Sequence, residues 1–197
     1  MLQNLDNYKV FLASGSPRRH ELLQMLGVPF EVMRGHDADE VYPSDLAPER
    51  VPEFLARLKA GAYRPFLPSD GLMITADTVV ILGDEIIGKP SDEADACRML
   101  RKLASHTHHV VTGVCITTAT HSESFSCTTA VTFGPLTDDE ITEYVRDFRP
   151  LDKAGAYGIQ ESIGAVAVER IDGSFYNVMG LPVNRLYRAL QHIEPRE

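Results

Sequence analysis

Segments with strand-like and helix-like spacing alternate along this chain of 197 residues, and this alternation limits the fold more than any other feature. Short apolar or β-branched runs predict strands at residues 8–13, 29–33, 72–82, 85–87, 110–118, 126–133 and 166–171. Helical spacing begins near residues 17, 51, 91, 137 and 182. Such a mixture predicts one α/β domain over residues 1–197, with a mixed sheet at its centre.

Several helix boundaries are marked by residues with known end preferences. Ser16 followed by Pro17 is typical of a helix start, and Gly27 is typical of a helix end. Thr137 and Glu140 have the spacing of a capping box, in which each residue satisfies a backbone N–H of the other. These residues predict where two of the helices begin.

Composition and charge exclude several classes of protein. Hydrophobic residues make up 44% and charged residues 24%, which is ordinary for a globular chain with a sizeable core. The formal net charge of -9 argues against a protein that grips duplex nucleic acid, because such a protein needs a basic surface. No segment approaches the roughly 18 consecutive apolar residues of a membrane span.

The cysteines and the first ten residues indicate the cellular compartment in which the protein is expected. Cys97, Cys115 and Cys127 are odd in number and scattered, so they form neither a disulfide framework nor a CxxC zinc site. Residues 1–10 lack the basic segment and apolar stretch of a signal peptide. We therefore expect reduced thiols and a cytoplasmic protein.

The junction between the first predicted strand and helix has the character of an anion site. A helix N-terminus presents backbone N–H groups and a positive dipole end. Ser14 and Ser16 add hydroxyl groups, and Arg18 and Arg19 add guanidinium groups that suit phosphate oxygens. An ordinary capped helix with two solvated arginines explains the same residues.

Acidic residues supply a second group of candidates. Asp77 lies inside the apolar run 73–82, where a carboxylate is costly unless it is paired or binds a metal. Such an acid can hold a divalent cation or deprotonate a water molecule, although a turn at a strand end would also explain it. Glu40 can supply a further carboxylate, or belong to a solvated acidic loop.

Three lysines, Lys59, Lys89 and Lys153, stand in positions where they can bind phosphate, although most lysines are simply solvated. The chain contains no GxxxxGK[ST] phosphate loop, no GxGxxG after a strand and no GxSxG elbow. The residues taken singly therefore indicate an α/β protein with dispersed anion-binding and acidic groups.

Four sequence blocks taken together resemble the Maf family of nucleotide pyrophosphatases. They are LASGSPRR at 12–19, ADTVV at 76–80 with GKP at 88–90, DKAGAYGIQ at 152–160, and GLP at 180–182. The blocks occur in the family's order over nearly the whole chain. The fold that this resemblance implies is the Maf/ITPase-like α/β fold, an elongated mixed sheet flanked by helices, with two lobes around a central cleft.

The resemblance also implies an activity and roles for individual residues. Maf proteins hydrolyse nucleoside triphosphates between the α and β phosphates with a divalent metal cation, here expected to be Mg²⁺ or Mn²⁺. Asp77 matches the family's proton-accepting catalytic acid and, with Glu40, would bind the metal. Arg18, Thr78 and Gln160 match positions linked to selection of the base.

Arg19, Lys59, Lys89 and Lys153, together with the metal, would neutralise the charge of the triphosphate and of the departing diphosphate. Lys89 is expected to take part in catalysis. The expected phosphate-binding residues are Ser14, Ser16, Arg19, Lys59 and Lys153.

The DKAGAYGIQ block resembles the branch of the family that acts on dTTP and UTP. We therefore expect hydrolysis of these nucleotides to the monophosphate and diphosphate, which would limit incorporation of unwanted or modified nucleotides. Two alternatives stay open: the same hydrolysis on 7-methyl-GTP, and a nucleotide-binding regulator of cell division or septum formation. The sequence sets no oligomeric state, and a homodimer stays open.

The chain departs from the family pattern at two places. The family's Ser-Gly after the helix at 91–103 is replaced by Ala104-Ser105. The family's glycine after the matched glutamine is replaced by Glu161, which places a negative charge near the expected base pocket.

Overall fold

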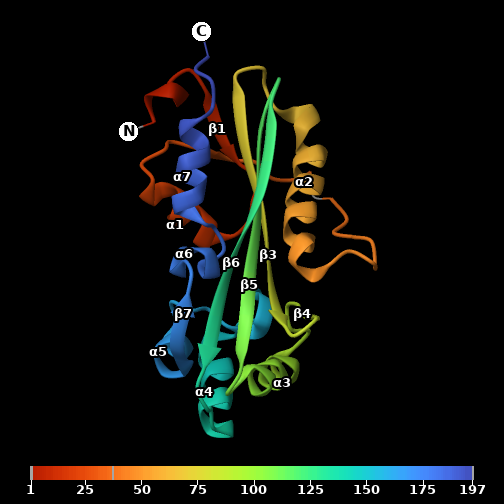
Figure 1. Ribbon diagram of the computed structural model, residues 1–197, viewed down its shortest axis with the longest axis vertical. Coiled ribbons are helices and arrows are strands. Elements are labelled where there is room, and N and C mark those ends of the chain that lie inside the picture. Colours follow the sequence, from red (N-terminus) through yellow and green to blue (C-terminus); the bar gives the residue numbers. More distant parts are fainter. Residues whose placement is uncertain (1, 37, 197) are drawn as a thin grey trace. The chain divides into compact units, whose positions relative to one another are not determined.

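Within residues 2–36 and 38–196, which the computed structural model describes, seven strands form one mixed sheet (Figure 1). The strands are β1 (Lys9–Leu12), β2 (Glu31–Val32), β3 (Gly71–Leu82), β4 (Glu85–Ile87), β5 (Thr107–Thr118), β6 (Ser122–Phe133) and β7 (Val168–Asp172). Their order is β2-β1-β3-β5-β6-β7, with β4 paired to β3. The pairs of β1 with β2 and β3 are parallel, whereas β3–β4 and β6–β7 are antiparallel.

The chain divides into two units, which we call the first unit and the second unit. The first unit contains Met1–Asp77, Thr112–Cys127 and Gly180–Glu197, and the second contains Thr78–Val111 and Thr128–Met179. Three of the four boundaries fall inside β3, β5 and β6, and the fourth directly follows Met179. The α/β class and the mixed sheet with flanking helices are confirmed. The single domain over residues 1–197 and the cleft implied by the resemblance stay predictions.

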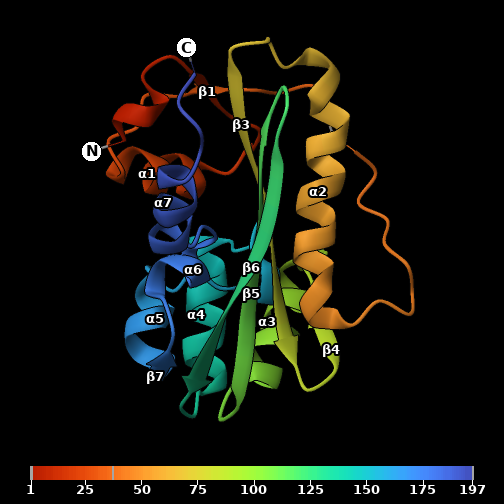
Figure 2. The same cartoon turned by 45° about the horizontal axis from the view of Figure 1, so that its top comes forward.

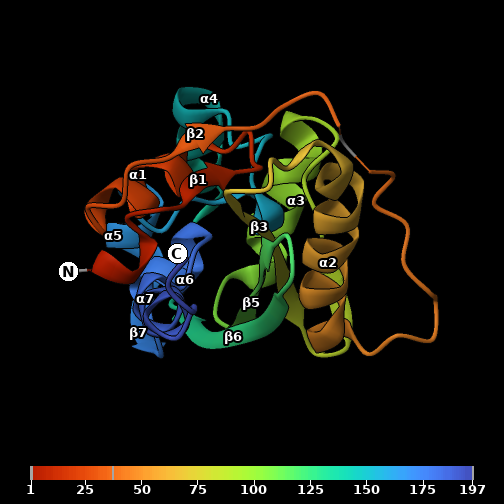
Figure 3. The ribbon, with the colours of Figure 1, turned by 90° about the horizontal axis from the view of Figure 1, so that it is seen from above.

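The helices of the first unit cover both sides of its strands. They are α1 (Pro17–Met25), α2 (Val51–Tyr63) and α7 (Val183–Gln191), with short 3₁₀ turns at Gln3–Leu5, Pro48–Arg50 and Arg64–Phe66. Figures 2 and 3 show α2 on one side of the strands and α1 and α7 on the other. As predicted, α1 starts with Pro17 after Ser16 and stops before Gly27, whose φ of 67° favours glycine.

Helix α2 packs closely on β3 and β5. A Cβ added at Gly113 would collide with the backbone of Pro52 and Glu53, so glycine is what permits this approach. The Thr75 hydroxyl of β3 donates to the carbonyl of Ala56 at 2.7 Å. The apolar cluster around this contact consists of Ala13, Ala56, Ala60, Tyr63, Met73 and Cys115. This packing fixes the face of α2 that carries Lys59.

The second unit contains four α-helices among its residues, all of which are described. They are α3 (Glu93–Leu103), α4 (Asp138–Phe148), α5 (Ser162–Ala167) and α6 (Phe175–Met179), with a 3₁₀ turn at Ala154–Ala156. The predicted capping box of Thr137 and Glu140 is present at the start of α4. Helix α3 starts slightly later than expected, because the Asp92 side chain caps it by accepting from Asp95 N at 2.8 Å.

The predicted strand at 166–171 is wrong at its beginning. Residues 162–167 form α5, and the strand starts only at Val168. The apolar run there has no clear strand alternation: Ile163 and Ala167, four residues apart, are buried, whereas Val166 between them is exposed. Helix α6 was not predicted. Among the helices of the described residues, none combines the length and apolar character of a bilayer span.

One departure from the family pattern carries a backbone cost. Ser105 has a φ of 60°, in the left-handed region where glycine is favoured. Its N–H donates to the Gly134 carbonyl at 2.9 Å, which holds the turn between α3 and β5 in place. Serine adopts this conformation at a cost of roughly 1–2 kcal/mol.

Candidate functional site

The turn between β1 and α1 presents two hydroxyl groups beside a helix N-terminus. Ser16 occupies the N-cap position without making a side-chain capping bond. Ser14 Oγ accepts from Ser16 N at 3.2 Å. Arg18 follows in the first turn of α1 and is partly buried. The junction predicted from the sequence as an anion site therefore has the expected strand–turn–helix form, which suits a phosphate group.

Arg19 ties three of the sequence blocks together within the first unit. Its Nε donates to the carbonyl of Gly180 at 2.8 Å, and Nη1 donates to the carbonyl of Ala76 at 2.9 Å. Nη1 also lies 3.4 Å from Ser14 Oγ. Burial lowers the pKa of Arg19 from its ordinary value, while the carboxylate of Asp77 opposes that change. Backbone carbonyls thus hold the guanidinium group, and the negative charge of Asp77 stabilises its positive charge.

A lysine between two carboxylates forms the centre of the first unit's site. Asp77 on β3 is only 8% exposed. Lys59 Nζ on α2 lies 2.6 Å from Asp77 Oδ1 and 2.9 Å from Glu40 Oε1. The structure therefore brings together three residues that the sequence had named separately. Because Asp77 is paired, its presence in an apolar strand no longer carries the cost of an isolated buried charge.

The donor set fits a divalent cation that is bound together with a substrate. No group of three or more His, Cys, Asp or Glu side chains that could hold a metal occurs in residues 2–36 and 38–196. Glu40 and Asp77 nevertheless both approach one positive group, the Lys59 ammonium. Mg²⁺ commonly takes one or two carboxylates and completes its shell with water and phosphate oxygens. Two protein carboxylates meet that requirement.

The second unit joins the GKP and DKAGAYGIQ blocks. Gly155 N donates to the carbonyl of Gly88 at 2.9 Å. Gly155 has a φ of 71°, and a Cβ there would lie 3.0 Å from Val80 of β3. The backbone conformation therefore favours glycine here, and a larger residue would press against Val80. Lys89, next to Gly88, is exposed, and Thr78 on β3 is partly buried.

Lys153 is the buried cation of the second unit. Its side chain is 9% exposed, and its Nζ lies 2.8 Å from Asp152 Oδ1 and 3.2 Å from Glu161 Oε1. The Glu161 carboxylate also accepts a hydrogen bond from the Tyr144 hydroxyl. Gln160, one residue earlier, is exposed.

Tyr144 is a residue of this region that the sequence did not reveal. At helical spacing a buried tyrosine indicates core packing, and no local signal discloses the partner of its hydroxyl. The site candidates are divided between the units. Ser14, Ser16, Arg18, Arg19, Glu40, Lys59 and Asp77 lie in the first, and Thr78, Lys89, Lys153 and Gln160 in the second.

Comparison with known proteins places the chain in a family. Residues 9–193 match the family model described as Maf-like protein. A dTTP/UTP pyrophosphatase of Porphyromonas gingivalis is 54% identical over 193 residues, covering 97% of each chain. One from Phocaeicola vulgatus is 52% identical, covering 98% of this chain and 100% of its own. One from Flavobacterium psychrophilum is 44% identical over 188 residues, covering 95% and 96%. Because the family model and these relatives both span nearly its whole length, the chain belongs to the Maf family.

Proposed function

We propose that this protein is a nucleoside triphosphate pyrophosphatase that hydrolyses dTTP and UTP to the nucleoside monophosphate and diphosphate. The observation that carries the proposal is Asp77, a buried acid on a strand, paired with Lys59, which also contacts Glu40. The relatives at 44–54% identity bear the name of the same activity. Together they favour hydrolysis at a phosphate over binding alone.

The first unit supplies the groups for the chemical step. Asp77 accepts a proton from water, whose oxygen forms a bond to the α phosphorus. The bond from that phosphorus to the oxygen bridging to the β phosphate breaks, and its electron pair leaves with the diphosphate. Lys59 donates to Asp77 and orients its carboxylate. A divalent cation held by Glu40 and Asp77 would supply positive charge to the phosphate oxygens.

We assign binding of the triphosphate to basic and hydroxyl side chains. Ser14, Ser16 and Arg19 surround the N-terminus of α1, where an anion is favoured. Lys89 and Lys153 of the second unit supply positive charge for the departing diphosphate.

Selection of the base is assigned to Arg18, Thr78 and Gln160. The amide of Gln160 contains both a donor and an acceptor. It therefore complements the N3–H donor and the carbonyl acceptors of uracil and thymine. A base with the opposite pattern, once it covers the exposed Gln160 side chain, leaves these polar groups unpaired, at a cost of about 1–3 kcal/mol for each.

The cellular setting belongs to the same proposal. We expect a cytoplasmic enzyme, in line with three scattered cysteines that are all free. Its expected purpose is to limit incorporation of unwanted or modified nucleotides, and Mg²⁺ or Mn²⁺ is the expected metal. A homodimer is compatible with these expectations.

Two other functions make different demands on the same residues. Hydrolysis of 7-methyl-GTP would keep the chemical step but would not use the match between the Gln160 amide and a pyrimidine. A regulator of septum formation that only binds nucleotide would gain nothing from a buried carboxylate, because Asp77 repels an anionic ligand.

A nucleotide panel distinguishes these functions. Release of diphosphate is measured from dTTP, UTP, ATP, GTP and 7-methyl-GTP in the presence of Mg²⁺ or Mn²⁺. We expect kcat/KM to be highest for dTTP and UTP by roughly tenfold or more. Equal values for dTTP and 7-methyl-GTP would reject pyrimidine selection, and no turnover of any nucleotide would reject the enzyme.

A further inference from the structure

A tight turn presents Gln160. The N–H of Glu161 donates to the carbonyl of Gly158 at 2.9 Å, which closes a four-residue turn. Gln160 is the third residue of this turn and is exposed, whereas Gly158 and Ile159 before it are buried. The direction in which the Gln160 amide points is therefore set by how firmly the two ends of the turn are held.

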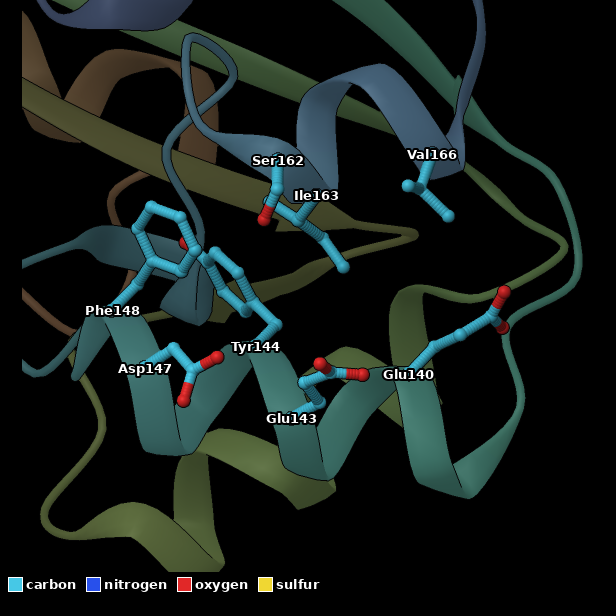
Figure 4. A pocket seen from close by; sticks show the side chains of 8 residues that line it. All are labelled: Glu140, Glu143, Tyr144, Asp147, Phe148, Ser162, Ile163 and Val166. Atoms are coloured by element: carbon cyan, nitrogen blue, oxygen red, sulfur yellow. The ribbon is translucent and has the colours of Figure 1, made fainter.

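One phenol hydroxyl holds both ends. Tyr144 on α4 accepts from Gly158 N at 3.1 Å and donates to the Glu161 carboxylate. Its ring stacks on Phe148, and Figure 4 shows both rings on the side of α4 that faces Ser162 and Ile163 of α5. Burial and, after it, the hydrogen bond to Glu161 raise the pKa of Tyr144, so the hydroxyl keeps the proton that it donates.

Glu161 links the same turn to the buried lysine. Its second oxygen lies 3.2 Å from Lys153 Nζ, and its side chain is 17% exposed. The carboxylate folds back over the turn and lies against Gly158: a Cβ at Gly158 would lie 2.7 Å from Glu161 Cδ. The phenol and the ammonium thus hold the two oxygens of one carboxylate, directly after the residue assigned to base selection.

We propose that Tyr144 and Glu161 are positioning residues for base selection, which fix the turn on which Gln160 stands. The inference rests on the proposed function, in which the Gln160 amide recognises the base. Donor and acceptor atoms discriminate between bases only when they are held in the matching geometry. A loosened turn lets the amide adapt to other bases. The preference for dTTP and UTP over other nucleotides should therefore fall more than kcat does.

Tyr144→Phe tests this by removing a single hydroxyl from a buried ring. Tyr157→Phe is the matched control, because the Tyr157 hydroxyl is also buried in the second unit but binds His108 Nε2 at 2.8 Å. Both kcat and KM are measured for dTTP, UTP and GTP. We expect Tyr144→Phe to raise KM for dTTP and to lower the dTTP to GTP ratio of kcat/KM, each by roughly fivefold. Tyr157→Phe should leave that ratio unchanged.

A second pair of variants separates the two partners of Glu161. Glu161→Ala removes both contacts and should lower the ratio as Tyr144→Phe does. Glu161→Gln keeps an oxygen that can accept from Tyr144 but loses the charge opposite Lys153. We expect it to keep most of the dTTP to GTP ratio of kcat/KM that Glu161→Ala loses. Folding is checked by urea unfolding of each variant.

The possible outcomes separate the inference from the function beneath it. If the unmutated protein shows no preference for dTTP and UTP, the proposed function fails. If that preference exists and is kept in both folded variants, Tyr144→Phe and Glu161→Ala, then the positioning role alone is overturned. A fall in the ratio equally large in Tyr157→Phe would also overturn it, because general loosening of the unit would then be the cause.

Discussion

Each unit holds a lysine between two carboxylates, yet the two clusters differ in what surrounds the acids. In the first unit, Lys59 joins Asp77 and Glu40. In the second, Lys153 joins Glu161 to Asp152, and each cluster has one exposed acid, Glu40 at 51% and Asp152 at 57% side-chain exposure. Burial of the lysine is similar, at 17% and 9% side-chain exposure, so the cations do not distinguish the clusters.

The acids make the distinction. Asp77 stands on a buried strand within the electrostatic influence of Arg19, in the unit that also carries the helix N-terminus suited to phosphate. The Glu161 carboxylate is engaged by the Tyr144 hydroxyl and serves the local turn. A lysine paired with two acids is therefore no sign of catalysis by itself, and the surroundings of each acid decide its use.

Removal of the metal should have the largest effect and should act through the first cluster. Two protein carboxylates repel a triphosphate, and the divalent ion that we propose at Glu40 and Asp77 would offset the charge of both. We expect diphosphate release to fall below detection in excess EDTA and to return with Mg²⁺ or Mn²⁺. Full activity in EDTA would contradict the assignment of the cluster.

Asp77→Asn should be the most damaging single substitution. The amide keeps the size of the side chain and a hydrogen bond to Lys59, but it cannot accept the proton of the attacking water. We expect kcat to fall by roughly a thousandfold, within the range for loss of a general base. Asp152→Asn is the matched change in the second cluster and should alter kcat by no more than about threefold, because that acid is largely exposed. Equal losses in both variants would erase the difference between the clusters.

The acid stability of the second unit should depend on His108. This side chain is fully buried, its Nε2 faces Tyr157, and its Nδ1 has no hydrogen-bond partner among the described residues. Burial and, to a smaller extent, His109 lower its pKa from 6.5 to about 4. The unfolded chain takes up this proton near pH 6.5 and the folded chain only near pH 4. The contribution of neutral His108 to the free energy of unfolding is therefore full above pH 6.5 and is lost as the pH falls toward 4.

Urea unfolding at pH 7 and pH 4.5 measures this loss. We expect about 2–3 kcal/mol from His108 over that interval. His108→Phe removes the titrating group and should flatten the pH dependence by that amount, even if its stability at pH 7 is lower. His106→Gln changes an exposed histidine and should not flatten it. An unchanged slope in His108→Phe would assign acid sensitivity to other groups.

The sequence predicted most elements of the fold because their signals are local. Pro17 after Ser16 and the Thr137–Glu140 capping box mark helix ends without reference to the rest of the chain. Helices α5 and α6 are only six and five residues long, too short for a helical period to be recognised. Their formation depends on tertiary packing, which no window of sequence contains.

The site was predictable to a different extent. Asp77 is visible as a carboxylate inside an apolar run, whereas Arg18, Thr78 and Gln160 acquired their proposed roles only through the family resemblance. Tyr144 gave no signal, because its partners lie 14 and 17 residues further along the chain and are brought to it by packing.

The smallest expected effect concerns a position where this chain departs from the family pattern. Ser105 has a φ of 60° and Ala104 a φ of -55°, so a glycine relieves backbone strain only at position 105. Ser105→Gly should raise the free energy of unfolding by roughly 0.5–1 kcal/mol, because the strain removed exceeds the entropy that glycine loses on folding. Ala104→Gly, one residue earlier, pays only the entropy and should lower stability by about 0.5–1 kcal/mol. If Ser105→Gly raises the free energy of unfolding and Ala104→Gly lowers it, the strain lies at Ser105. If both variants are destabilised equally, the hydrogen bond from Ser105 N to Gly134 holds a turn that serine adopts without strain.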